Sequence, residues 1–240
     1  MEEKILQQHI TEIRKYLKTD VRYDLSLIPR PFIIELAGSP SSGKSELIDG
    51  IDSLLRRNGL KHVERPQEGA TAIRHISRTT PLYNLRTALE ALPKLIDVAA
   101  GHAHDVVLFE RGAFDAYVWM CDWHKNGKLS DEELSAARTV LLSRFWIDTI
   151  DIAYFVVCDP EETIRRYLHK SSSQKTGGTT NLKKVTELRE VYMEGYRQLS
   201  PEFPQLQLID TTHMSIPEMI DMVFEKTIIA LAKKTNPSSP

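Results

Sequence analysis

The sequence predicts an α/β protein: a mostly parallel sheet of five strands with helices on both faces, preceded by an N-terminal helix. Two observations support this prediction. Five short apolar segments alternate with stretches whose apolar residues recur every three or four positions, which is typical of parallel strands joined by helices. The third and fourth segments are nearly continuous apolar runs, as expected of strands buried on both faces. The predicted strands are residues 32–37, 61–64, 105–109, 153–157 and 206–209.

The first predicted helix covers residues 1–18, where Ile5, Leu6, Ile10, Ile13 and Leu17 follow helical spacing. This pattern gives an amphipathic helix. We expect the helix to pack over an edge of the sheet, and the alternative role for it is homodimerisation.

The bulk composition limits the class of protein. The chain has 240 residues, of which 41% are hydrophobic and 27% charged, the composition of a soluble globular domain. Its net charge of -2 provides no overall attraction to nucleic acid. The N-terminus has no long apolar segment, so neither a secretory signal nor a membrane span is predicted. Cys121 and Cys158 lack metal-ligand or redox-motif spacing, which favours a cytoplasmic location.

A phosphate-binding loop follows the first predicted strand. Glycines let the backbone approach a polyphosphate closely, so that its N–H groups can surround the phosphates. In this motif Lys44 neutralises the β- and γ-phosphates of ATP, and the hydroxyl of Ser45 binds Mg²⁺. An apolar helical stripe that ends at Asn58-Gly59 completes the strand–loop–helix context. The loop has the pattern G-x-x-x-x-G-K-S and consists of Gly38, Ser39, Pro40, Ser41, Ser42, Gly43, Lys44 and Ser45.

Polar residues also follow the second and third predicted strands, at the sheet edge where parallel sheets bind ligands. Glu110 ends the third strand, and we expect it near Mg²⁺ or the water molecules bound to it. The guanidinium of Arg111 can bridge two phosphate oxygens. Glu68 lies a few residues beyond the second strand and is the favoured base or acceptor anchor, with Glu64 as its competitor.

A basic helical segment then leads into a loop rich in Ser, Thr and Gly. We expect a lid near residues 165–182. Arginines delivered by a closing lid stabilise the charge on a transferring phosphoryl group, and Arg165 and Arg166 are the first candidates, followed by Lys170 and Lys175. The alternative interpretation is a solvated basic face.

Three predicted helix starts carry a polar N-cap with Glu three residues later. They are Ser130 with Glu133, Asp159 with Glu162, and Ser215 with Glu218. The first overlaps residues 122–133, which nearly match the twelve-residue calcium loop. His124 breaks this match because a hard, oxygen-seeking ion disfavours imidazole. We therefore expect a helix cap there rather than a calcium site.

The order of these motifs resembles that of the P-loop nucleoside and nucleotide kinases, and it is most similar to the deoxynucleoside kinase, thymidylate kinase-like and nicotinamide riboside kinase-like groups. The resemblance implies a P-loop NTPase fold and three parts: a helix and connector (1–30), a kinase domain (31–232) and a disordered tail (233–240). The motifs that carry it are the phosphate loop, Glu68-Gly69-Ala70, Glu110-Arg111-Gly112 with Asp115 and Trp119, Asp159-Pro160 through Arg165-Arg166, and Asp210.

By this resemblance, the chain is an ATP- and Mg²⁺-dependent kinase acting on a small acceptor, with a nucleoside or nucleotide favoured. The lid lacks the dense arginine cluster of many nucleotide kinases, and no base-recognition signature identifies the acceptor. Two alternatives stay open: a kinase acting on a nucleic-acid hydroxyl, and a non-catalytic regulator that binds ATP. Candidates for the acceptor pocket are Arg74, Tyr83, Arg86, Tyr117, Trp119 and Trp123.

Overall fold

The computed structural model describes residues 2–17, 30–60, 63–65, 73, 75–101, 103–170 and 181–235. Its centre is a sheet of five parallel strands in the order β2-β3-β1-β4-β5, which confirms the predicted fold class. Strand β1, which precedes the phosphate loop, lies in the middle. The strands are β1 (Phe32–Gly38), β2 (Val63–Glu64), β3 (Val106–Glu110), β4 (Ile152–Val157) and β5 (Leu206–Asp210).

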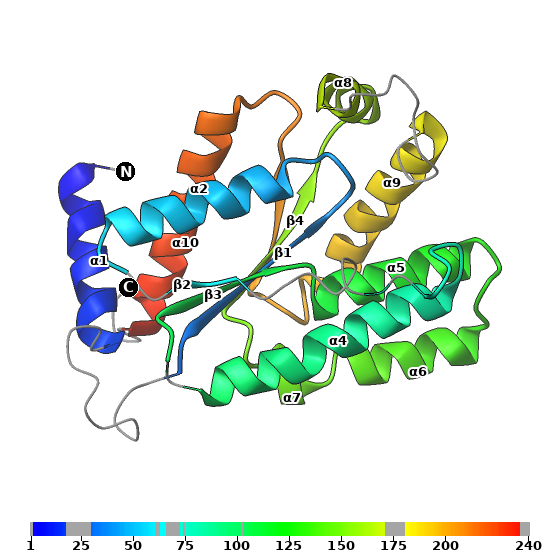
Figure 1. Cartoon of the computed structure of the whole chain (residues 1–240), viewed down its shortest axis with the longest axis horizontal. Helices are drawn as coiled ribbons and strands as arrows, with labels where there is room; N and C mark the ends of the chain where they lie inside the picture. Colours follow the sequence, from blue (N-terminus) through cyan, green and yellow to red (C-terminus); the bar gives the residue numbers. More distant parts are fainter. Residues whose placement is uncertain are drawn as a thin grey trace.

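Helices cover both faces of this sheet (Figure 1). One face packs against α1 (Glu3–Leu17), α2 (Lys44–Arg57) and α10 (Ile216–Thr235). The other packs against α4 (Pro81–Ala100), α5 (Ala113–Lys125), α6 (Asp131–Leu141), α7 (Arg144–Ile147) and α9 (Leu182–Leu199). Helix α8 (Pro160–Lys170) follows β4 beyond the carboxyl end of the sheet.

Strand β1 is buried on both faces because it is the central strand. Successive side chains alternate between the two faces of a strand. Ile34 and Leu36 therefore join the core around α2 and α10, whereas Ile33 and Ala37 join the core around α4, α5 and α9. By this alternation the side chain of Glu35 lies on the same face as Ile33 and Ala37, and it is only 1% exposed.

Helix α1 packs against α10, where it buries Ile10, Ile13 and Leu17. Tyr16 of α1 also stacks on Phe32 at the start of β1, with ring centroids 5.8 Å apart. The helix thus covers α10 and the beginning of the central strand, rather than the open edge of the sheet. None of the described helices is long and apolar enough to cross a membrane.

The C-terminal helix is longer than the sequence predicts. Helix α10 continues to Thr235, and the Lys234 ammonium forms an ion pair of 2.8 Å with buried Asp151. Residues 233–235 are therefore helical, so the prediction of a disordered tail was wrong for them. The rest of that tail, residues 236–240, lies outside the described residues, as does the predicted lid loop at 171–180.

Two of the three predicted helix caps form as expected. Ser130 and Glu133 make a complete capping box at α6, which confirms a cap there, and Ser215 and Glu218 exchange the same bonds before α10. Asp122 and His124, which begin the near-match to a calcium loop, lie within α5 instead of a loop, and the carboxylate of Asp122 pairs with Lys184 over 2.7 Å.

Candidate active site

The phosphate loop joins the central strand β1 to helix α2, as predicted. Gly38 has a φ of +146°, and a Cβ there would lie 2.0 Å from the carbonyl oxygen of Val156, so only glycine fits. Gly43 has a φ of +101° and is the N-cap residue of α2. Since glycine has no side chain, no N-cap side chain stands between the start of α2 and the loop. This is the arrangement that binds anions at helix N-termini.

Polar groups of the loop point inward. Lys44 is 5% exposed, and its Nζ donates a hydrogen bond of 2.8 Å to the carbonyl oxygen of Ser39. The hydroxyls of Ser39 and Ser42 are buried and have no hydrogen-bond partner among the described residues. Buried hydroxyls without partners are uncommon, and in a loop of this shape they fit an oxyanion ligand.

Ser45 and Glu110 come together across the sheet edge. Glu110 ends β3, which pairs with β1 so that Glu110 lies opposite Leu36. The Ser45 hydroxyl donates to Glu110 Oε1 over 3.0 Å. A hydroxyl and a carboxylate are hard oxygen ligands, the kind that Mg²⁺ prefers. These two residues therefore fit the predicted metal site.

Arg111 adopts a left-handed backbone conformation, with φ of 64°, which is uncommon for a residue other than glycine. Its backbone N–H donates to Leu36 O (2.9 Å), and its guanidinium forms bonds of 2.9 and 3.1 Å with the buried carboxylate of Asp115. Asp115 also accepts a 3.4 Å bond from the N–H of Gly38. The Arg111 side chain is thus attached, through Asp115, to the first residue of the phosphate loop.

Sequence reasoning missed Glu35. Its carboxyl group is buried in the central strand and accepts hydrogen bonds from the N–H groups of Asp115 (3.0 Å) and Phe114 (3.5 Å). Burial raises the pKa of Glu35 to about 8, and the nearby charge of Asp115 adds to the shift. The only sequence signal is a charged residue at an inward position of a predicted central strand.

The two predicted lid arginines lie on α8 but make different contacts. Arg165 is 64% exposed and forms a two-bond ion pair with Glu162, which lowers the pKa of Glu162 to about 2. Glu162 also pairs with Arg166, so it does not complete the predicted cap with Asp159. Asp159 instead caps the helix alone, by accepting from the N–H of Glu161.

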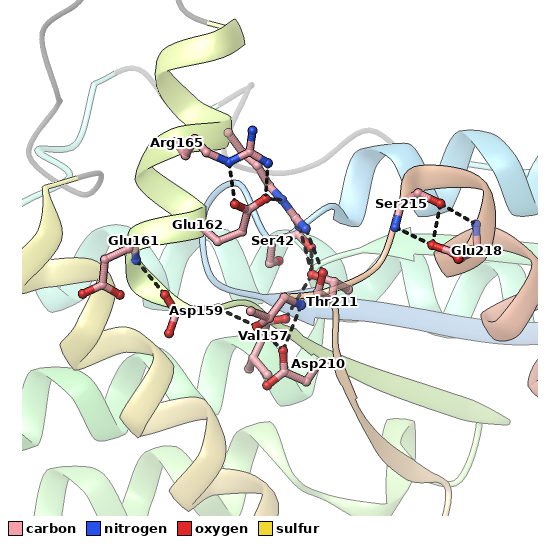
Figure 2. Close-up of polar contacts among 12 residues, drawn as sticks. Ser42, Val157, Asp159, Glu161, Glu162, Arg165, Asp210, Thr211, Ser215 and Glu218 are labelled. Atoms are coloured by element: carbon pink, nitrogen blue, oxygen red, sulfur yellow. Dashed lines mark hydrogen bonds and ion pairs between the residues drawn. The ribbon is translucent and has the colours of Figure 1, made fainter.

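Thr211 connects helix α8 to the phosphate loop (Figure 2). Its hydroxyl lies 2.9 Å from the carbonyl oxygen of Ser42 and 3.2 Å from that of Val157. Arg166 donates to the same hydroxyl (3.1 Å) and to the carbonyl oxygen of Thr211 (2.7 Å). Thr211 is fully buried, so Arg166 is held at a fixed distance from the loop.

We predict that Thr211→Val destabilises the protein by about 1–2 kcal/mol, because valine keeps the shape of threonine but leaves the Ser42 carbonyl and the Arg166 guanidinium each without one bond. Thr211→Ser keeps the hydroxyl and should lose less. Urea unfolding of both variants measures the difference. A valine variant as stable as the wild type would show that the hydroxyl contributes nothing.

A hollow of about 280 Å³ lies between α8 and the start of α10, directly beside the loop. It has both charged and apolar side chains in its lining, and it adjoins the loop at Ser41 and Gly43. Its lining residues are Ser41, Gly43, Glu46, Glu162, Arg165, Arg166, His169, Met214, Ser215, Ile216 and Met219.

Most of the described candidates for the acceptor pocket are buried in the core or paired with other side chains. Tyr83, Tyr117 and Trp119 are buried to the extent of core residues, with exposures of 6–9%. Arg86 pairs with Glu90 on α4, and the indole N–H of Trp123 donates to Asn84 (2.9 Å). Of the two candidate bases, Glu64 ends β2 and is half-buried. Glu68 and Arg74 lie outside the described residues.

Comparisons with known proteins find solved structures with a similar fold. No protein-family model matches the sequence, and no curated protein matches it significantly. Three structures of deoxyadenosine kinase from M. mycoides match over 82% of this chain and 98% of theirs, at 14% sequence identity. The TM-scores are 0.61 with dCMP and dCDP bound, 0.59 with dATP and 0.55 with dCTP. The chain therefore has the fold of these deoxyadenosine kinases.

Proposed function

We propose that this chain is a kinase that transfers the γ-phosphate of ATP to a hydroxyl of a nucleoside. The observation that carries the proposal is the pairing of the Ser45 hydroxyl with Glu110 beside the N-terminus of α2, where Gly43 provides no capping side chain. This pairing supports a hard-oxygen metal site next to the phosphate loop, in a chain with the fold of the deoxyadenosine kinases. Phosphoryl transfer needs little more than such positioning and neutralisation of charge.

In this proposal the phosphate loop holds the donor phosphates. The backbone N–H groups at the start of α2 and the ammonium of Lys44 would bind the β- and γ-phosphate oxygens. Ser45 and Glu110 would hold Mg²⁺, which supplies charge neutralisation between the phosphates when bound. Arg111 extends toward the same edge and provides a second cation for the oxygens of the transferring group, oriented by Asp115.

The hollow between α8 and α10 would receive the base of the donor. It adjoins the loop at Ser41 and Gly43, so that a nucleotide with its phosphates in the loop reaches it directly. The planar guanidinium of Arg165 can cover one face of the base, and Met214 and Ile216 offer apolar contacts on the α10 side.

We therefore predict that Arg165→Ala raises the KM for ATP by about 5–10-fold with little change in kcat, because a stacking contact contributes mainly to binding. Arg197→Ala is a matched control: Arg197 is 67% exposed and pairs with Glu194, as Arg165 pairs with Glu162, but it lies on α9 and does not line the hollow. An unchanged KM in the Arg165 variant would exclude this base site.

The acceptor would approach from the side of β2 and β3. A carboxylate at the end of β2 would take the proton of the attacking hydroxyl, with Glu68 and Glu64 as the two candidates. We propose a nucleoside because the matched deoxyadenosine kinase structures contain dCMP, dCTP or dATP. Glu64→Gln and Glu68→Gln, measured separately, should identify the base by the larger loss of kcat.

A transfer assay tests the proposed function. The full chain is incubated with γ-labelled ATP, Mg²⁺ and a panel of ribo- and deoxyribonucleosides, nucleoside monophosphates and 5′-hydroxyl oligonucleotides. We expect labelled monophosphate from at least one nucleoside. Label on the oligonucleotide alone would indicate a nucleic-acid kinase. ATP binding without label on any acceptor would favour a regulatory ATP-binding protein.

A further inference from the structure

The N-terminus of α5 is capped by a residue of strand β1. Its N-cap residue is Gly112, which has no side chain to accept the first N–H groups of the helix. Glu35 of β1 fills this role instead, because its carboxyl oxygens accept from the N–H groups of Phe114 and Asp115. An unsatisfied helix N-terminus is costly when buried, so the carboxyl group fixes where α5 begins.

Gly112 shows how closely Glu35 fits this position. The φ of Gly112 is -168°, extended backbone that any residue can adopt. A Cβ at Gly112 would nevertheless lie 2.6 Å from Glu35 Oε2. The need for glycine here therefore comes from contact with Glu35 and not from the backbone conformation.

Contacts continue from this cap to the phosphate loop. The backbone of Asp115 is held by Glu35, and its carboxylate binds the Arg111 guanidinium and the N–H of Gly38. The hydroxyl of Tyr192 on α9 donates to the same carboxylate over 2.5 Å. A shift of the start of α5 would thus move Arg111 relative to the loop.

We propose that Glu35 is a positioning residue: it anchors the N-terminus of α5 and, through Asp115, sets the place of Arg111 beside the first glycine of the phosphate loop. This role rests on the proposed kinase function, because Arg111 acts there on the transferring phosphate. Glu35 itself faces α5, whereas Glu110 lies with Ser45 on the α2 side of the sheet. Its action on the reaction is therefore indirect.

The charged and titratable groups around Glu35 make its role pH-dependent. Asp115 lies against it, Arg111 neutralises Asp115, and Tyr192 bonds to Asp115 from α9. Burial raises the pKa of Glu35 to about 8, so the group is mostly protonated at neutral pH. Above that pH a second buried negative charge would develop beside Asp115 and disturb the anchor.

Three variants test the proposal in the full-length protein. Glu35→Gln keeps one carbonyl acceptor and cannot ionise, so its kcat at pH 7 should stay close to that of the wild type and should lack the fall above pH 8. Glu35→Ala removes the acceptors and should lower kcat about 10–100-fold with little change in the KM for ATP, as expected of misplacement. Gly112→Ala should lower kcat in the same way, and less so in the Glu35→Ala background, where the contact is absent.

Hydrogen exchange of the Phe114 and Asp115 amides gives a readout independent of catalysis. Faster exchange of both amides in Glu35→Ala, with at least one of them restored in Glu35→Gln, would support the anchor even if no acceptor were phosphorylated. A failure of the proposed function can thus be distinguished from a failure of this proposal. Unchanged exchange, or a folded Glu35→Ala protein with the kcat of the wild type, would overturn the proposal. If the alanine variant does not fold, a Gly112→Ala protein with wild-type kcat and exchange would overturn it equally.

Discussion

Lys44→Ala is expected to lower kcat for phosphoryl transfer by about 10³-fold, the scale at which a buried charge-stabilising group acts. Lys44 is the first residue of α2 and is almost completely buried, with its ammonium held against the loop backbone at Ser39. Its charge is therefore placed where donor phosphates would lie and is only weakly screened by water. The measurement is steady-state kinetics with the acceptor found in the transfer assay.

The fold should survive this change, because Lys44 contributes a charge and not a core side chain. The unfolding free energy of Lys44→Ala measures this directly. Lys125→Ala is a suitable control, since Lys125 is an exposed lysine at the far end of α5 that pairs with Glu190. Normal turnover in the Lys44 variant, or an equal loss in the Lys125 variant, would contradict the assignment of the loop.

Glu35→Gln is expected to reduce the pH dependence of stability. The pKa of Glu35 rises from 4.5 to about 8 on folding, so between these values the folded protein holds a proton that the unfolded chain releases. The stability linked to this proton is fully present below pH 4.5 and is lost as the pH rises through about 8. The loss amounts to roughly 5 kcal/mol.

Urea unfolding at several pH values between 5 and 9 tests this prediction. The unfolding free energy of the wild type should fall relative to that of Glu35→Gln as the pH rises, whatever the constant offset between the two proteins. The test is how the difference in unfolding free energy between the two proteins changes with pH, because glutamine cannot titrate. Parallel pH profiles would show that Glu35 has an ordinary pKa in the folded protein.

The fold and the phosphate loop could be predicted from sequence because both depend on local patterns. Apolar runs identify the strands, and the loop is a continuous sequence motif with glycines at fixed positions. The pairing of Ser45 with Glu110 also followed from the rule that carboxyl ends of parallel strands share one edge. Each of these inferences needs only the chain order.

Glu35 and Thr211 could not be predicted because their roles depend on which elements pack together. Glu35 acts on a helix that begins nearly eighty residues later, and Thr211 bonds to Ser42 across most of the chain. The error at Glu162 has a different cause. Arginines three and four residues further along the same helix compete for its carboxylate, and such pairs are favoured on a helix surface.

The partition of the γ-phosphate between an acceptor and water tests the central claim most directly. With labelled ATP, Mg²⁺ and a nucleoside, we expect the label to appear mainly in nucleoside monophosphate, at a rate that the Lys44→Ala variant loses. Label found only in inorganic phosphate, at a rate that the nucleoside does not change, would mean that the site hydrolyses ATP and would contradict the assignment as a kinase.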